Sequence, residues 1–442
     1  MAAIFADAAA ATARVNSGDT VMIGGFGGIG SPDTLLQGLV GQDCGDLTCI
    51  TTTSGVPDQG LGLLLRENRI RKLRLCFLTR NPEAVQAYLA DSLDVDFVPM
   101  GTMAEAIRAG GSGIPAFYTA TGTGTDLVAG QEIRDFGGQP YALVSAMRAN
   151  VALIRANTAD RLGNLTYRRS ERTFGPAMAK AADLTIAEVD QIVETGDLDP
   201  EQIVTPHAYV DIVVVRDPAI SSNEARGRLN AQWSPSDVLI AQRVAREVRP
   251  GQIVNLGTGI PSLVKNYLTG KSVFLQTENG ILGVGPAPEP GQEDYGLTDA
   301  MGQLVTLDTG ASIFDSTEAF AMIRGGHVDI TVMGGLQVSE HGDLANWSVP
   351  RAGRIGVGGA MDLVSGARQV IIAMNHVDRH GAPKLVKECT LPLTGQRTVD
   401  CVITELAVFD FVADVLTLRE LQPGVTLAEV REKTAASFRV AR

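Results

Sequence analysis

The chain has 442 residues, of which 45% are hydrophobic and 20% are charged, as in an ordinary globular protein of two or three domains. Its formal net charge of -13 at pH 7, and the lack of any block of Lys or Arg, argue against a nucleic-acid partner. No apolar run is long enough to cross a bilayer, so we expect no membrane partner.

The N-terminal segment, "MAAIFADAAAATARVNSGD", is alanine-rich and places Asp7 before its first basic residue, Arg14. A signal peptide has the opposite order of charge, so this segment predicts a first helix. The five cysteines show no CxxC spacing and lie mostly in apolar, strand-like runs, a pattern typical of free thiols in a reducing compartment. We therefore expect a cytoplasmic protein.

Short β-branched runs then alternate with helical patterns along the chain. The runs include "TVMIGG", "LTCITTT", "LRLCFL", "VALIRA", "ADLTIAEV", "QIVNLG", "SVFLQT", "VDITVMGG" and "QVIIAM". Such alternation predicts an α/β fold with mainly parallel sheets.

The alternation lapses between Arg216 and Pro235, where the sequence is polar and rich in turn residues. We expect residues 216–235 to link a domain over 1–215 to a second domain over 236–442. Residues 18–40 and 250–268 resemble each other, since both contain a strand, a glycine loop and a proline that starts a helix. Pro32 and Pro261 suit a first helical turn, and Ser31 suits an N-cap. The likeness suggests two related domains.

The first glycine loop contains Gly25, Gly27 and Gly30, which match the dinucleotide-binding pattern G-x-G-x-x-G. That function also needs an acidic residue at the end of the second strand to bind ribose, but this strand ends in Thr51, Thr52, Thr53 and Ser54. A nicotinamide site is therefore disfavoured. A tight turn without a ligand and a loop that approaches another anion both stay open.

A stronger candidate lies in "SVFLQTENGILGVGP", residues 272–286. An apolar strand ends at Thr277 and presents Glu278 on a turn, with glycines at 280, 283 and 285 that we expect to leave space around the carboxylate. The carboxyl end of a central strand is where α/β sheets place ligands. Glu278 is thus a candidate site residue.

These motifs closely resemble family I CoA-transferases, the group that contains the 3-oxoacid CoA-transferases. The first half resembles the alpha subunit through "GGFG", "GIPAFYTATGTGT" and "DRLGNLTYR". The second half resembles the beta subunit through "NLGTGIP", "TENG", "FAMIRGGHVDITVMGGLQVSEHGDLANW", "GVGGAMDLV" and "KECTLPLTG". The resemblance implies two related open-sheet α/β domains, fused in one chain, with Glu278 and the loops near Gly25 and Gly257 facing a shared cleft.

The resemblance also implies a mechanism. Glu278 would be a nucleophile that carries CoA as a thioester in a ping-pong reaction, Gly359 would stabilise an oxyanion through its N–H, and Asn255 would lie near the reacting centre. Since an ordinary glutamate is ionised at neutral pH, no general base is expected. The residues implied to bind CoA or the acid are Gly24, Gly25, Gly27, Gly28, Thr52, Thr53, Met100, Gly257, Gly280, Gly358 and Ala360.

The implied substrates are an acyl-CoA such as succinyl-CoA and a 3-oxo acid such as 3-oxoadipate or acetoacetate. CoA would be a substrate held transiently by a covalent bond, with no permanent cofactor and no metal. His376 and His380 have i, i+4 spacing, but "DRHGAP" around them indicates a turn, which disfavours a metal site. We expect a homo-oligomer, either a dimer or a tetramer.

Three positions depart from the family pattern. Thr52-Thr53 stands where related alpha subunits commonly have Asn-Asn, Met100 stands where they often have Gln, and Thr277 precedes Glu278 where serine is common. The first two changes remove amides that could bind a substrate, so a carboxylic acid other than a 3-oxo acid stays open as the acceptor. An acyl-CoA hydrolase, a ring-opening hydrolase and a ligand-sensing module on the same fold stay as alternatives.

Overall fold

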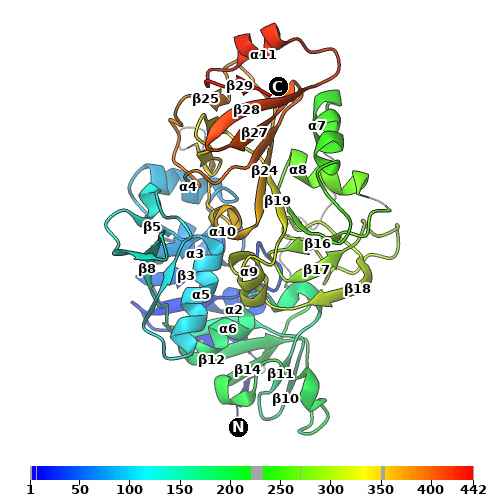
Figure 1. The fold of residues 1–442 in the computed structure, drawn as a ribbon. Coiled ribbons are helices and arrows are strands. Elements are labelled where there is room, and N and C mark those ends of the chain that lie inside the picture. The colour runs from blue at the N-terminus through cyan, green and yellow to red at the C-terminus, as the bar shows by residue number, and fades with distance from the viewer. Residues whose placement is uncertain (1, 6, 221–231, 269, 350–353, 442) are drawn as a thin grey trace.

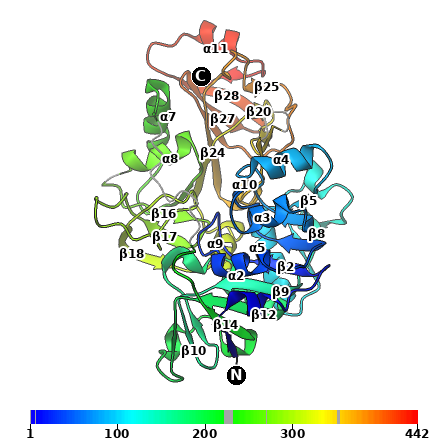
Figure 2. The same cartoon turned by 180° about the vertical axis from the view of Figure 1, so that it is seen from behind.

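The computed structural model describes residues 2–5, 7–220, 232–268, 270–349 and 354–441. The predicted α/β fold is confirmed: two large sheets, each flanked by helices, form the two halves of the molecule (Figures 1 and 2). No described helix has the length and hydropathy that crossing a bilayer requires.

The first sheet has eight strands from residues 3–215, and every neighbouring pair is parallel. The strands at its centre are short runs of β-branched and aliphatic residues that are mostly buried on both faces, as is typical of parallel sheets, whereas the strands over 70–75 and 94–97 at one end carry charged and partly exposed residues. In spatial order they are β1 (Ala3–Phe5), β14 (Ile212–Val215), β12 (Ala182–Val189), β9 (Ala149–Arg155), β2 (Thr20–Ile23), β3 (Leu47–Ile50), β4 (Ile70–Leu75) and β5 (Asp94–Phe97).

The second sheet has ten strands from residues 253–440 and is mixed, with a parallel centre between the strands over 274–277 and 401–403 and antiparallel hairpins on either side of it. In spatial order its strands are β18 (Leu307–Ile313), β17 (Ile281–Val284), β16 (Phe274–Thr277), β15 (Ile253–Leu256), β19 (Ile330–Met333), β24 (Gln369–Ala373), β26 (Cys401–Ile403), β27 (Ala407–Val412), β28 (Val415–Leu421) and β29 (Arg439–Val440).

Helices cover both sheets and also join them. One continuous hydrophobic core includes Met103 and Ile107 of α5 (Met100–Gly111) together with Phe320 and Ile323 of α9 (Ser316–Arg324), so helices of the two halves pack against each other in the middle of the molecule (Figure 1). The helices are α1 (Ala8–Thr12), α2 (Asp33–Val40), α3 (Leu61–Arg66), α4 (Pro82–Leu89), α5 (Met100–Gly111), α6 (Gly175–Lys180), α7 (Pro235–Ala245), α8 (Ile260–Leu263), α9 (Ser316–Arg324), α10 (Ala360–Gly366) and α11 (Leu427–Lys433).

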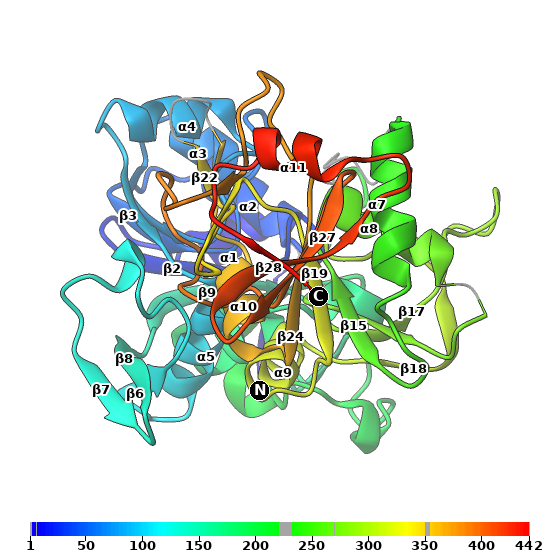
Figure 3. The same ribbon diagram turned by 45° about the horizontal axis from the view of Figure 1, so that its top comes forward.

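Short strands form four small sheets at the periphery, and one of them projects from the first half on the side away from α7 (Figure 3). That sheet contains β6 (Ala116–Thr119), β8 (Gln139–Ser145) and β7 (Ile133–Phe136). The others pair β11 (Leu165–Thr166), β10 (Thr158–Asp160) and β13 (Gln191–Val193); β21 (Leu344–Ala345), β20 (Gln337–Ser339) and β25 (Leu385–Val386); and β22 (Ser348–Val349) with β23 (Arg354–Ile355).

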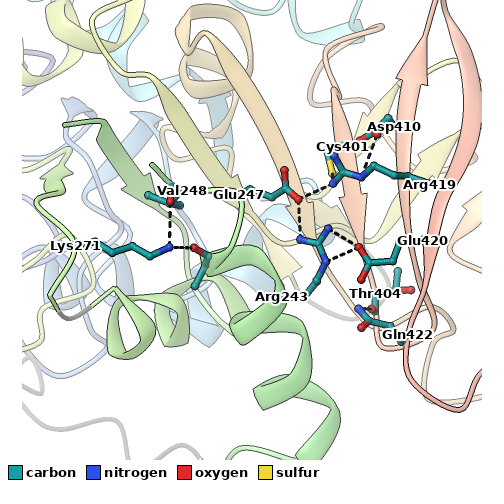
Figure 4. A network of polar contacts seen from close by, with 11 residues as sticks. Arg243, Glu247, Val248, Lys271, Cys401, Thr404, Asp410, Arg419, Glu420 and Gln422 are labelled. Carbon is teal, nitrogen blue, oxygen red and sulfur yellow. Dashed lines mark hydrogen bonds and ion pairs between the residues drawn. The ribbon is translucent and has the colours of Figure 1, made fainter. Parts of the chain in front are cut away.

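The second half begins with α7, which is fastened at both ends. Ser234 and Asp237 form a reciprocal capping box at its start. Near its C-terminus, the buried Arg243 donates hydrogen bonds to Glu420 at 2.8 and 3.0 Å and to Glu247 at 2.7 Å (Figure 4). The expected linker over 216–235 lies between β14 and α7, and its residues 221–231 fall outside the described part of the chain.

Candidate active site

Glu278 lies on the tight turn between β16 and β17, at the carboxyl end of β16. The turn is closed by the Gly280 N–H, which donates to the Thr277 carbonyl at 3.0 Å. A second hydrogen bond fixes the turn, because the buried Asn279 side chain donates to the Thr298 carbonyl at 2.8 Å. Glu278 itself is only half-buried. The strand end therefore presents the carboxylate on a fixed backbone.

Gly359, at the N-cap of α10, faces the carboxyl of Glu278. A Cβ at position 359 would lie 2.8 Å from Cδ of Glu278 and 2.9 Å from each of its carboxylate oxygens. Only glycine leaves room for the carboxyl here. Among the described residues, no acceptor for the Gly359 N–H is found, so this group is available as a donor beside Glu278.

The three glycines after Glu278 do not serve the carboxylate, and the interpretation that they leave space around it is wrong. A Cβ at Gly280 would clash with the Phe314 carbonyl, and one at Gly283 would lie 2.8 Å from Cβ of Ala311. Gly285 likewise faces Thr306. These glycines let β17 approach β18 and the loops around it closely, so they support the strand rather than the acid.

Asn255 lies on β15 directly opposite Gln276 of β16. Its amide nitrogen donates to the Gln276 side chain at 2.9 Å and main-chain carbonyl at 3.3 Å, while its side-chain oxygen has no partner among the described residues. Two residues later, Gly257 donates its N–H to the Val332 carbonyl of β19 at 2.8 Å. Asn255 is thus buried next to the strand that carries Glu278.

The electrostatics of Glu278 differ from the expectation of an ordinary ionised glutamate. Burial, and secondly the negative charge of Asp362, raise the pKa of Glu278 to about 7. At neutral pH a substantial fraction of the free protein therefore carries a protonated Glu278. The carboxylate that remains is more basic than a surface glutamate.

Five of the predicted binding residues line a cavity of about 290 Å³ in the first half: Gly24, Gly25, Gly28, Thr52 and Thr53. We call this the first-half cavity; its lining also includes Ser31, Asp33, Gln37, Asp58 and Gln59. Of the described residues that line it, none is Lys or Arg. Gly27 is outside the lining, and its carbonyl accepts a hydrogen bond from Arg80 at 2.6 Å. Glu278 and Gly257 do not line this cavity either, so it is not the shared cleft that we expected.

The helix that follows the first glycine loop has its N-terminus occupied by a carboxylate. Pro32, rather than Ser31, is the N-cap of α2, and no side chain of the loop caps it. Instead Glu188, buried at the end of β12, accepts the N–H groups of Thr34 at 2.8 Å and Leu35 at 3.1 Å. Burial raises the pKa of Glu188 to about 7. These two donors are therefore not free to bind an anionic ligand.

A second group of predicted residues lies beside Gly359 instead. The Met100 N–H donates to the Gly358 carbonyl at 2.9 Å, and Gly358 and Ala360 flank Gly359 in the chain. The Met100 side chain is buried in the core and does not line the first-half cavity. Phe77 lies between Thr53 of the first group and Gly356, two residues before Gly358, because it forms a β-bridge with each of them.

Two acidic residues at these places were not predicted from the sequence. Asp362 is fully buried in the first turn of α10, three residues after Gly359, and it acts on the charge of Glu278. Its signal was the acid three residues after the last glycine of "GVGGAMDLV". The signal of Glu188 was an acid near the end of the apolar run "ADLTIAEV". We call Glu278, Gly359, Asp362 and the buried Cys76, on which both acids act electrostatically, the carboxylate cluster.

The histidine pair has a structural explanation. Both ring nitrogens of the buried His376 lie at hydrogen-bond distance from hydroxyls, Nδ1 at 3.0 Å from Thr404 and Nε2 at 2.9 Å from Thr434. The part of the chain that the structure describes contains no group of three His, Cys, Asp or Glu placed to hold a metal ion.

The two α/β sheets and the carboxylate cluster agree with the class of protein that a family comparison gives. The family model of the coenzyme A transferases matches residues 5–216 and 238–433, so the chain belongs to this family and is a CoA transferase. It is 41% identical to succinyl-CoA:3-ketoacid coenzyme A transferase 2A, mitochondrial, of Mus musculus, over 99% of this chain and 89% of that protein.

Two further similar proteins bear on the halves and on the fold. One is a single subunit of a probable succinyl-CoA:3-ketoacid coenzyme A transferase of Bacillus subtilis (strain 168), which is 53% identical over 46% of this chain and 94% of its own length. The other is the solved apoenzyme of acyl-CoA transferase YdiF from Escherichia coli O157:H7, which is 22% identical, with a TM-score of 0.84 over 100% of this chain and 94% of that chain. It shows that the whole fold is shared.

Proposed function

We propose that this enzyme transfers CoA from succinyl-CoA to a 3-oxo acid, and that Glu278 carries the CoA between the two acids. The observation that carries the proposal is the carboxyl of Glu278, fixed at a strand end against the N–H of Gly359, for which the described residues offer no acceptor. The substrates are supported by the names of the relatives at 41% and 53% identity, which specify succinyl-CoA and 3-ketoacids.

In the proposed reaction a carboxylate oxygen of Glu278 attacks the acyl carbon of succinyl-CoA. The C–S bond breaks, CoA leaves as a thiolate with the bonding electron pair, and a mixed anhydride remains. The thiolate then attacks the glutamyl carbon of that anhydride and releases succinate, which leaves CoA on Glu278 as a thioester. A 3-oxo acid carboxylate reverses these two steps and departs as its CoA ester. No oxidant, proton donor or water is consumed.

Within this mechanism the Gly359 N–H donates to the oxyanion of each tetrahedral intermediate, and Asn255 supports the strand that bears Glu278. Loss of one such oxyanion donor typically costs roughly 2.7 to 4 kcal/mol of transition-state stabilisation. We assign the first-half cavity, with Thr52 and Thr53, to substrate binding. Acetoacetate and 3-oxoadipate are both candidate acceptors.

We also propose that residues 1–215 and 236–442 are two domains joined by 216–235, each contributing one side of the site. A cytoplasmic location and a homo-oligomeric state complete the proposal. Size-exclusion chromatography with light scattering measures the oligomeric state.

The test is to isolate the covalent intermediate. The purified enzyme is incubated with succinyl-CoA and no acceptor, and the intact mass is measured. We expect a mass increase equal to CoA less one water, and peptide mapping should place it on Glu278. Adding acetoacetate, or in a second sample 3-oxoadipate, should remove the adduct and yield the corresponding CoA ester.

Glu278→Gln should form no adduct, whereas the control Glu318→Gln, an exposed glutamate on α9, should form it normally. An adduct on another residue, or transfer by Glu278→Gln at the wild-type rate, contradicts the proposed nucleophile. Rapid release of free CoA and succinate without an acceptor would indicate a hydrolase. Discharge of the adduct by a panel of acids other than 3-oxo acids would correct the substrate class.

A further inference from the structure

Asp362 connects the two halves of the molecule at the carboxylate cluster. It belongs to the first turn of α10 in the second half, but its carboxylate is bonded by two groups of the first half. The Gly101 N–H donates to one oxygen at 2.8 Å, and the Thr121 hydroxyl donates to the other at 3.2 Å. Asp362 is fully buried. Both oxygens therefore lie in a contact that water does not reach.

The first turn of α5 is shaped to receive this carboxylate. A Cβ at Gly101 would lie 2.5 Å from an oxygen of Asp362 and 2.7 Å from the ring of Phe320, so position 101 has no room for a side chain. The Gly101 carbonyl accepts a hydrogen bond from Arg324 of α9 at 3.2 Å. Together with the bond from the Met100 N–H to the Gly358 carbonyl, these contacts fasten the start of α5 to the start of α10.

The same turn of α10 holds Gly359 against Glu278, so the two carboxylates belong to one small region. Burial raises the pKa of Asp362 to about 6, against the opposing effects of Arg324 and of the hydrogen bonds from Gly101 and Thr121. Asp362 on α10 acts on Glu278, and Arg324 on α9 acts on Asp362. Both acids in turn act on Cys76 after β4, where burial followed by the two acids raises the pKa of the thiol well above its usual value.

We propose that Asp362 is a positioning residue for CoA transfer: it holds α5 against α10 so that Gly359 stays beside the carboxyl of Glu278, and its negative charge makes Glu278 a stronger nucleophile. The inference rests on the proposed role of Glu278. Its physical basis is that a like charge nearby destabilises a carboxylate and makes it more basic, and nucleophilicity rises with basicity, as it does for thiolates.

The experiment measures the single-turnover rate of adduct formation on Glu278 from succinyl-CoA as a function of pH. Asp362→Asn keeps the size of the side chain and an oxygen that accepts the Gly101 N–H, but it removes the charge. We expect the acid limb of its profile to move about one pH unit lower than in the wild type. The rate on the alkaline plateau should fall about three-fold, as a Brønsted coefficient of 0.4–0.5 requires.

Thr121→Val is the matched control, because it removes one hydrogen bond to Asp362 but keeps the charge. It should slow adduct formation at all pH values and leave the acid limb within about 0.3 pH units of the wild type. An Asp362→Asn profile that is slower but not displaced, like that of Thr121→Val, would reduce Asp362 to a structural role and overturn the proposal. Ionisation of succinyl-CoA affects the wild-type and variant profiles equally, because all of them use the same donor, so it does not contribute to a difference between them.

A second measurement covers the case in which Asp362→Asn does not fold. The pKa values of about 6 for Asp362 and about 7 for Glu278 mean that Asp362 ionises first, so its negative charge is present when Glu278 loses its proton. Carbon NMR titration of labelled Asp and Glu carboxyls in the wild type, without substrate, reports this order directly, and a Glu278 that ionises before Asp362 overturns the proposal. If the wild type instead forms no adduct on Glu278 while Asp362 proves to ionise first, the proposed function fails rather than the order of ionisation.

Discussion

The first-half cavity and the carboxylate cluster contrast in shape and in charge. The cavity is an open volume of about 290 Å³ lined by glycines, threonines and glutamines, with Asp33 and Asp58 as its charged described residues. The cluster is a contact between two halves in which the half-buried Glu278 faces a glycine and the buried Asp362 lies three residues after that glycine. Of the residues that the resemblance groups together, some line the cavity and others lie beside Gly359. The cavity suits recognition of a ligand, and the cluster suits chemistry on a carboxylate.

Replacing Glu278 should have the largest effect on the transfer rate. We expect Glu278→Gln to lower the transfer rate by at least about 10³-fold, because a neutral amide is a poor nucleophile. Thr53→Val, an isosteric change in the cavity at a hydroxyl without a described partner, should cost at most about tenfold and act mainly on KM. Steady-state assays of both variants measure this. Equal losses of kcat would remove the functional contrast between the two regions.

The pH dependence of the wild-type enzyme should report the cluster. Since protonated Glu278 does not attack, kcat/KM should fall about tenfold per pH unit below pH 7, and thus roughly 10²-fold at pH 5. Above pH 7 the profile should be level. A rate that is constant down to pH 5 would mean that Glu278 titrates like a surface glutamate.

A methyl group at Gly359 should displace the nucleophile. Its Cβ would lie 2.8 Å from Cδ of Glu278, and a shift of the carboxyl by about an ångström costs roughly 10- to 100-fold in kcat. Gly358→Asn is the control, because that position has a φ of 52° and open space around a Cβ, and asparagine tolerates this conformation. Its loss should stay below tenfold. Comparable losses in both variants would show that the contact with Glu278 is not the cause.

Folding stability should reveal the energetic cost of the cluster. The folded-state pKa of Glu278, about 7, exceeds its unfolded value, so ionisation opposes folding increasingly as the pH rises from about 4.5 to 7. Glu278→Gln avoids this cost. Relative to wild type, it should gain about 1 to 3 kcal/mol of unfolding free energy between pH 5 and pH 8 in denaturant titrations. A gain that does not change with pH would contradict the raised pKa.

Glu188, the buried acid at the end of β12, should stabilise the folded state, whereas ionised Glu278 destabilises it. Glu188→Met removes the acceptor for two N–H groups at the start of α2, whereas Glu188→Gln keeps one of similar size. We expect the Met variant to be about 1 to 2 kcal/mol less stable than the Gln variant at the same pH. Thermal and denaturant unfolding of the pair measure the difference. Equal stability would mean that Glu188 does not cap α2.

Local patterns were sufficient to predict the fold and the position of Glu278. Short buried runs that alternate with helical segments predict parallel sheets, and the run before Glu278 ends where its strand ends. Pro261 falls in the first turn of α8 as its position suggests. These features depend on a few neighbouring residues, which a single sequence displays.

Contacts between distant residues were beyond such patterns. Asp362 and Gly101 are 261 positions apart, and Glu188 and Thr34 are 154 apart, so no local pattern relates them. Burial of Glu278, which raises its pKa, likewise depends on how the halves pack. The sequence does not show the role of Gly280 for the same reason, because the Phe314 carbonyl that it faces lies more than 30 residues further along the chain.

The contacts between Gly101 and Asp362, and between Leu78 and Ile355, are made within one polypeptide. Their formation is unimolecular, so the cluster should survive dilution to concentrations at which two separate half-chains would dissociate. Because the two halves are covalently linked, their association does not depend on a binding affinity between separate subunits. Contacts between the halves can therefore be weaker than those that would hold two separate chains together.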